Sequence, residues 1–188
     1  MGTRNKWIDF SILSLCTLSF MGFVLRSKIV FALPFVNYNH LLEAHSHFTF
    51  GGWITLALIT LMVHELLPAA LNRKRLYEWL LGGITISAWG MLATFFIAGY
   101  NLFSITFSVI FILLTYFFGW IFIRDIIKAK PGPTVLLLAI SSIICLTISS
   151  SGTFIIAWIY FSKTFDAIVY RDALFTYCLL YTSPSPRD

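Results

Sequence analysis

The stretch HLLEAHSHFTFGGWITLALITLMVHELLP, residues 40–68, decides the fold class and contains the candidate site. All four histidines of the chain lie in it, near its two ends, on an otherwise largely apolar segment. As a helix, residues 40–67 extend roughly 42 Å at about 1.5 Å per residue, which exceeds a hydrocarbon core of about 30 Å. The pattern therefore predicts a membrane-spanning helix whose ends reach both interfaces and which stops at Pro68.

Ionisable side chains on this span are the first candidates for function, because hydrocarbon offers them no water and burial is costly unless a partner or cofactor compensates. We expect them at three levels: His40 and Glu43 among the headgroups, His45 and His47 just inside, and His64 and Glu65 at the opposite interface.

The composition is that of a membrane protein. Of 188 residues, 59% are hydrophobic and only 11% are charged, and the mean hydropathy is +0.86. These values lie outside the range of soluble domains. The formal charge of +5 comes from short basic clusters between apolar runs, a distribution typical of orientation determinants. We therefore expect a lipid bilayer as partner and no nucleic acid.

The apolar runs predict an all-α, polytopic transmembrane helix bundle of about five spans, followed by a truncated segment. The 47-residue run 77–123 is too long for one crossing, and Gly99, Tyr100 and Asn101 provide the break. One helical membrane domain over residues 1–177 is expected. Its spans are residues 7–25, 40–67, 77–99, 101–123 and 134–161.

Two sets of small polar residues predict helix packing. Gly83, Ser87, Gly90 and Thr94 recur at helical spacing, which favours close approach of a neighbouring helix over contact with a flat ring. The cluster at residues 149–153 is interpreted as hydroxyls bonded to their own helix or to neighbours, with a polar channel lining as the alternative.

Basic residues indicate the orientation. The N-terminus and the 68–76 and 124–133 loops together carry eight Lys and Arg, against four on the opposite side. This predicts a cytoplasmic N-terminus in a bacterial-type inner membrane. Residues 178–188, CLLYTSPSPRD, change abruptly in composition and resemble a translated sequencing adapter. We interpret them as a non-native tail on an N-terminal fragment.

Spacing limits the chemistry of the histidines. His45 and His47 are about 200° apart on a helix, and His40 and His47 are separated by about 10.5 Å of rise, so neither pair fits one small metal ion. Glu43 and His47, four residues apart, are spaced to interact. One histidine from one helix suffices as an axial haem ligand. Gly51, Gly52 and Trp53 follow directly and offer small and aromatic surfaces. The alternative is that the histidines are interfacial residues, which applies most simply to His64 beside Glu65.

AHSHFTFGGW followed by HELLP resembles the second helix of haem-copper oxidase subunit I-like proteins, the superfamily of cytochrome oxidase and nitric oxide reductase large subunits. The resemblance implies one axial ligand of a low-spin haem at His45 or His47, with His45 preferred. It also implies partner oxidase subunits or an electron donor.

The same resemblance implies that about twelve helices make up the whole protein and that its catalytic metal centre lies in later helices. The expected function is thus the N-terminal part of a haem-binding respiratory oxidoreductase subunit, inactive by itself. Two alternatives remain open: a non-enzymatic membrane protein, such as a transporter or assembly factor, and a haem-binding membrane sensor.

Overall fold

The computed structural model describes residues 3–31, 34, 36–72 and 74–162, and these are helical with short connections. The chain divides into two compact units, Met1–Ala129 and Lys130–Asp188. The expected tail 178–188 lies outside the described residues. Within the described residues, five helices are long and apolar enough to cross a membrane, which confirms the all-α membrane bundle.

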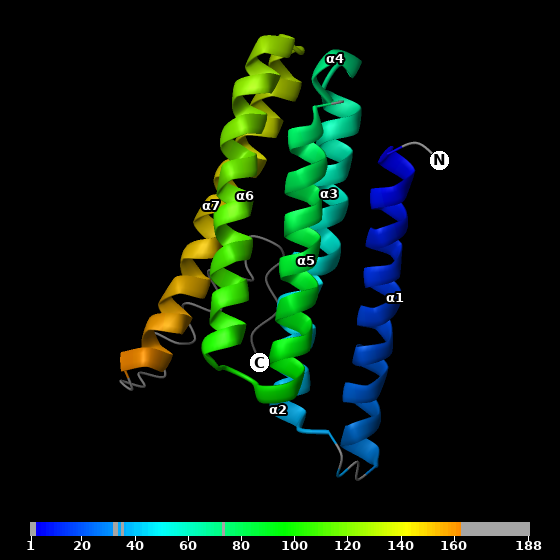
Figure 1. Cartoon of the computed structure of the whole chain (residues 1–188), viewed down its shortest axis with the longest axis vertical. Helices are drawn as coiled ribbons and strands as arrows, with labels where there is room; N and C mark the ends of the chain where they lie inside the picture. Colours follow the sequence, from blue (N-terminus) through cyan, green and yellow to red (C-terminus); the bar gives the residue numbers. More distant parts are fainter. Residues whose placement is uncertain (1–2, 32–33, 35, 73, 163–188) are drawn as a thin grey trace, which may run out of the picture. The chain divides into compact units, whose positions relative to one another are not determined.

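Four of these spans belong to the described part of the first unit, and Figure 1 shows how the chain runs through them. They are α1 (Thr3–Val30); a second span made of α2 (Tyr38–Phe48), η1 (Thr49–Thr55), α3 (Leu56–Leu61) and η2 (Met62–Leu66); α5 (Arg75–Ala98); and α6 (Leu102–Ala129). The short helix α4 (Ala69–Asn72) follows the second span. The second span packs against both α1 and α5, and α5 also packs against α6. The second span thus lies between α1 and α5.

The helix α1 buries one side, formed by residues three and four positions apart: Trp7, Ser11, Ser14, Leu18, Met21 and Leu25. This spacing keeps the buried side chains on one face along the whole helix. Large apolar side chains on the opposite face are exposed; Phe20 and Phe23 are 67% and 69% exposed. In a bilayer those side chains contact lipid, as the apolar composition requires.

The second span is not one regular α-helix. Two π-helical segments, η1 and η2, interrupt it, and η1 begins at Thr49, two residues after His47. Leu67 is extended, as expected before Pro68. Such π segments are rare and concentrate at functional sites. The sequence pattern predicts a continuous helix here, because hydrophobic spacing does not distinguish a π turn from an α turn over five to seven residues.

The α5–α6 pair shows the predicted close packing. A Cβ on Gly83 would lie 3.0 Å from Leu114, and one on Gly90 would overlap the ring of Phe107. Ser87 and Thr94 donate hydrogen bonds back to the Gly83 and Gly90 carbonyls at 2.8 Å. The predicted stripe therefore lets α6 side chains approach the α5 backbone.

The break between α5 and α6 falls at residues 99–101, as predicted. Gly99 has φ +60°, a conformation that residues with a Cβ rarely adopt. Asn101 Oδ1 accepts a hydrogen bond from the Ser104 N–H at 2.9 Å and so caps α6. We call this end of the first unit, where α2 also begins, the Gly99 end.

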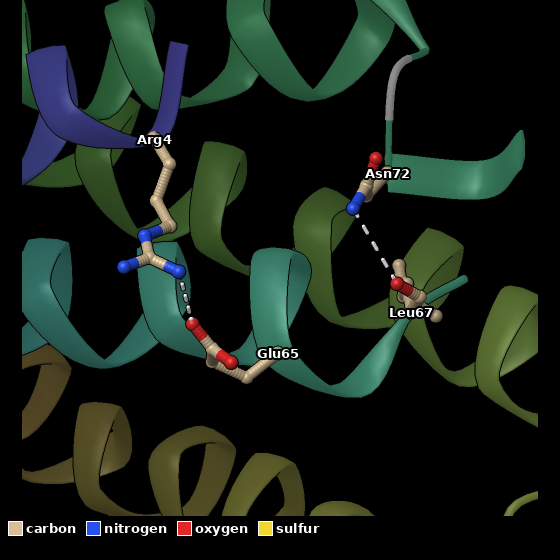
Figure 2. A network of polar contacts seen from close by, with 4 residues as sticks. All are labelled: Arg4, Glu65, Leu67 and Asn72. Atoms are coloured by element: carbon tan, nitrogen blue, oxygen red, sulfur yellow. Dashed lines mark hydrogen bonds and ion pairs between the residues drawn. The ribbon is translucent and has the colours of Figure 1, made fainter. Parts of the chain in front are cut away.

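The opposite end of the unit, which we call the Lys74 end, carries the ion pairs. Arg4 Nη1 lies 2.8 Å from Glu65 Oε1, as Figure 2 shows, and both side chains are 53% exposed. In the same figure the Asn72 amide donates to the Leu67 carbonyl at 3.4 Å, which satisfies a carbonyl at the end of the span. An exposed pair such as Arg4 and Glu65 contributes at most about 1 kcal/mol.

A buried network at this end corrects the prediction of a loop over 124–133. The helix α6 continues to Ala129, and Asp125 is buried. Asp125 Oδ2 accepts hydrogen bonds from Lys74 Nζ at 2.6 Å and from the Tyr77 hydroxyl at 2.9 Å. These donors compensate the burial of the carboxylate, so a charged residue does not end the helix.

The second unit contains the fifth span, α7 (Pro133–Ser162). Pro133 begins it, at the helical position where a missing N–H costs nothing. The hydroxyls of Ser142 and Ser150 donate to the carbonyls of Ala139 and Thr147. Within the predicted cluster at residues 149–153, Ser150 bonds back to its own helix, and the side chains of residues 151–153 lie outside the described part of the chain.

Candidate functional site

His45 and His47 lie on the same helix, α2, but face different neighbours. His45 lies against α1, where a Cβ on Gly22 would be only 3.3 Å from His45 Cε1. His47 stacks on Phe95 of α5, with ring centroids 4.4 Å apart and an interplanar angle of 8°. The structure therefore separates the two imidazoles, as their positions on one helix require.

His47 is engaged in contacts within the protein. Its Nε2 lies 3.1 Å from the Tyr100 hydroxyl, a hydrogen bond across 53 residues of sequence. The Tyr100 ring also meets Phe95 edge-on, with centroids 5.1 Å apart. Because Nε2 is occupied, His47 would have to break this bond before binding iron through that nitrogen.

We expect Tyr100→Phe to lower the free energy of unfolding by about 0.5–1.5 kcal/mol, because it removes the hydroxyl bonded to His47 and keeps the ring. Thermal unfolding in detergent measures the change. Tyr38→Phe, at an exposed position, is the matched control and should stay within about 0.5 kcal/mol of the parent protein. Equal midpoints for the two variants would contradict the role of this hydrogen bond.

The surroundings of His45 differ. Its side chain is half-buried, and Nδ1 is buried without a hydrogen bond of standard geometry. The backbone of Leu18 in α1 lies near this imidazole. The His45 carbonyl accepts a hydrogen bond from Thr49 Oγ1 at 2.7 Å, which fixes the backbone at the start of η1. Thr49 thus holds the main chain of His45, while α1 packs against its side chain.

His40 and Glu43 lie together at the Gly99 end. A Cβ on Gly99 would be 2.7 Å from His40 Cδ2 and 3.3 Å from Glu43 Oε2. These two side chains therefore fill the space that the glycine leaves open. Glu43 Oε2 is buried and makes no hydrogen bond. The structure places Glu43 beside His40 and the turn at Gly99.

The residues after the histidines face into packed regions. A Cβ on Gly51 would lie 3.2 Å from Met91 and 3.3 Å from Phe111, and one on Gly52 would overlap the Phe48 ring. Trp53 is partly buried against the core cluster of α1, α2 and α5. Protein side chains therefore fill the space beside both glycines. Contact of Gly51, Gly52 or Trp53 with a cofactor stays a prediction.

No group of three or more His, Cys, Asp or Glu side chains in the described ranges is arranged to hold a metal ion. His64 is half-buried at the Lys74 end, beside Glu65, whose carboxylate pairs with Arg4. The interfacial interpretation of His64 stays a prediction. No family model, curated protein or solved structure matches this chain.

Gly22 and Tyr100 are contacts of the histidines that the sequence pattern does not predict. Gly22 is one glycine in an apolar span, and Tyr100 is a turn residue. A glycine where neighbouring positions are bulky is a weak signal of close approach. Only the antiparallel pairing of α1 with α2 shows which side chain approaches Gly22.

Proposed function

We propose that this chain is a haem-binding integral membrane protein in which His45 provides one axial ligand. The observation that carries the proposal is the state of the His45 ring: half-buried, in contact with a glycine, and with a buried Nδ1 that makes no hydrogen bond. A buried nitrogen without a hydrogen bond costs about 1–3 kcal/mol. Protein positions that carry such a cost are candidates for function.

The groups around the two imidazoles favour His45 over His47 as the single axial ligand. The Leu18 backbone of α1 lies near the His45 imidazole without a hydrogen bond to Nδ1. A histidine that binds iron through one nitrogen commonly directs the other N–H towards a carbonyl. His47 fits less well, because Nε2 is bonded to Tyr100 and its ring is stacked on Phe95. Haem supplies one-electron transfer when it is bound in such a site.

The resemblance of AHSHFTFGGW to haem-copper oxidase subunit I-like proteins supports the same proposal. On this basis we propose a role in a respiratory membrane oxidoreductase, with an electron donor and partner oxidase subunits. The distribution of basic residues supports a cytoplasmic N-terminus in a bacterial-type inner membrane. In that orientation the Gly99 end, and His45 with it, lies towards the outer face.

The second candidate is a non-enzymatic membrane protein, favoured by one specific observation. The His47–Tyr100 hydrogen bond and the packing of His40 and Glu43 at Gly99 give three polar side chains a role in joining α2 to the α5–α6 turn. In this candidate His45 also serves only to join neighbouring helices, and the polar side chains at the Gly99 end stabilise the helix packing.

Titration of the purified chain with ferric protoporphyrin IX in detergent distinguishes the two candidates. The haem proposal predicts a Soret band that saturates at one porphyrin per chain and a reversible one-electron couple. Absorbance equal to that of porphyrin in empty detergent micelles would support the second candidate.

A further inference from the structure

We propose that Gly22 of α1 is the positioning residue for the His45 imidazole. This inference rests on the proposed function, because its purpose is to orient an axial ligand. Gly22 lies one position beyond Met21 on α1, beside the buried face of that helix, where neighbouring buried positions carry the bulky side chains Leu18 and Leu25. The glycine leaves a notch between them.

The contact between the ring and the notch is close. A Cβ on Gly22 would lie 3.3 Å from His45 Cε1, which is closer than ordinary carbon contacts of about 3.5–4.0 Å. Alanine would therefore displace the ring by a few tenths of an ångström, and valine by more. Because His45 is half-buried, its ring has room to turn away instead of forcing the helices apart. The expected change is in ring orientation.

The backbone beside the notch explains why orientation matters. Leu18 is four residues before Gly22, so its carbonyl lies one helical turn away on the same side of α1. The Leu18 backbone lies near the His45 imidazole, and Nδ1 makes no hydrogen bond to it. An N–H directed at a carbonyl fixes the tautomer of the ring and makes the other nitrogen a better iron ligand. Moving the ring out of the notch removes it from this carbonyl.

The His45 main chain is fixed independently of Gly22. Thr49 Oγ1 donates to the His45 carbonyl at 2.7 Å, and Ala44 beside it is fully buried. A substitution at Gly22 therefore acts on the side-chain torsions of His45, with the helix α2 held in place. This separates positioning of the ring from assembly of the helices.

The test compares Gly22→Ala and Gly22→Val with Gly82→Ala in the full chain. Gly82 is the matched control because its Cβ would make an ordinary contact, 3.6 Å from Trp7. Titration with ferric protoporphyrin IX should show affinity lowered about 10- to 100-fold for Gly22→Val, the range found when a group that orients a metal ligand is lost. Gly22→Ala should give a smaller loss and a shifted reduction potential, and Gly82→Ala should leave both unchanged.

A second readout does not depend on haem. In the apoprotein with labelled histidine, the Hε1–Cε1 resonance of His45, assigned with His45→Ala, should move in Gly22→Ala while that of His64 stays. Haem binding that survives His45→Ala would overturn the proposed function. A different result would contradict only the inference about Gly22. In that result His45→Ala loses haem, Gly22→Val binds haem as tightly as Gly82→Ala does, and the His45 resonance does not move in Gly22→Ala.

Discussion

Replacing His45 by alanine is expected to lower the affinity for ferric protoporphyrin IX by more than about 100-fold, beyond the effect of losing a group that only orients a ligand. His47→Ala should retain binding, because His47 Nε2 is bonded to Tyr100 and its ring stacks on Phe95. Titration of both variants in the same detergent, followed at the Soret band, measures the difference.

The two histidine variants act as controls for each other, since each removes one imidazole from α2. His47→Ala should lower the thermal unfolding midpoint through its lost contacts and yet bind haem. The double variant should bind no better than His45→Ala. The opposite order, with binding lost in His47→Ala and kept in His45→Ala, would contradict the assignment of the ligand. Normal binding by the double variant would show that neither imidazole is the ligand and would contradict the proposed function.

Asp125→Ala is expected to produce the largest loss of stability. The variant leaves the Lys74 ammonium and the Tyr77 hydroxyl without the carboxylate that now accepts from both. We expect a loss of about 3 kcal/mol, at the low end for breaking a buried pair because Lys74 is 37% exposed and retains water. Unfolding in a titration with sodium dodecyl sulfate, followed by circular dichroism, measures it.

Two further variants test whether the cause is the network. Asp125→Asn keeps an acceptor for Tyr77 and should lose less. The double replacement Lys74→Met, Asp125→Leu removes both charges and should recover much of the loss, since an apolar pair avoids the desolvation cost. Asp9→Ala, at an exposed position of α1, should change stability by no more than about 0.5 kcal/mol. A loss in Asp125→Ala no larger than in Asp9→Ala would show that the network contributes nothing.

The helices were predictable because apolar length alone determines them. Runs of about 20 apolar residues have few structures open to them in a bilayer, and breaks at Pro68 and Gly99 locate their ends. The exact bounds were less predictable. The helix α1 covers Thr3–Val30, beyond the expected 7–25, because amphipathic ends continue a helix outside the hydrocarbon.

The candidate site was predictable only in part. Helical spacing correctly separates His45 from His47, whereas the contact of His40 with Gly99 in the α5–α6 turn is seen only in the structure. The partners of each histidine come from helices distant in sequence, so no local pattern identifies Leu18, Gly22 or Tyr100. Asp125 was taken for a loop residue for the same reason, because its donors lie about 50 positions away.

Chemical rescue tests the central claim, that the imidazole of His45 holds iron, most directly. His45→Gly in the full chain removes the ligand and leaves an opening beside Gly22. We expect this variant to lose the Soret band of the bound porphyrin and to regain it, in saturable fashion, when free imidazole is added. A His45→Gly variant that binds ferric protoporphyrin IX like the parent chain, with no response to imidazole, would contradict the account.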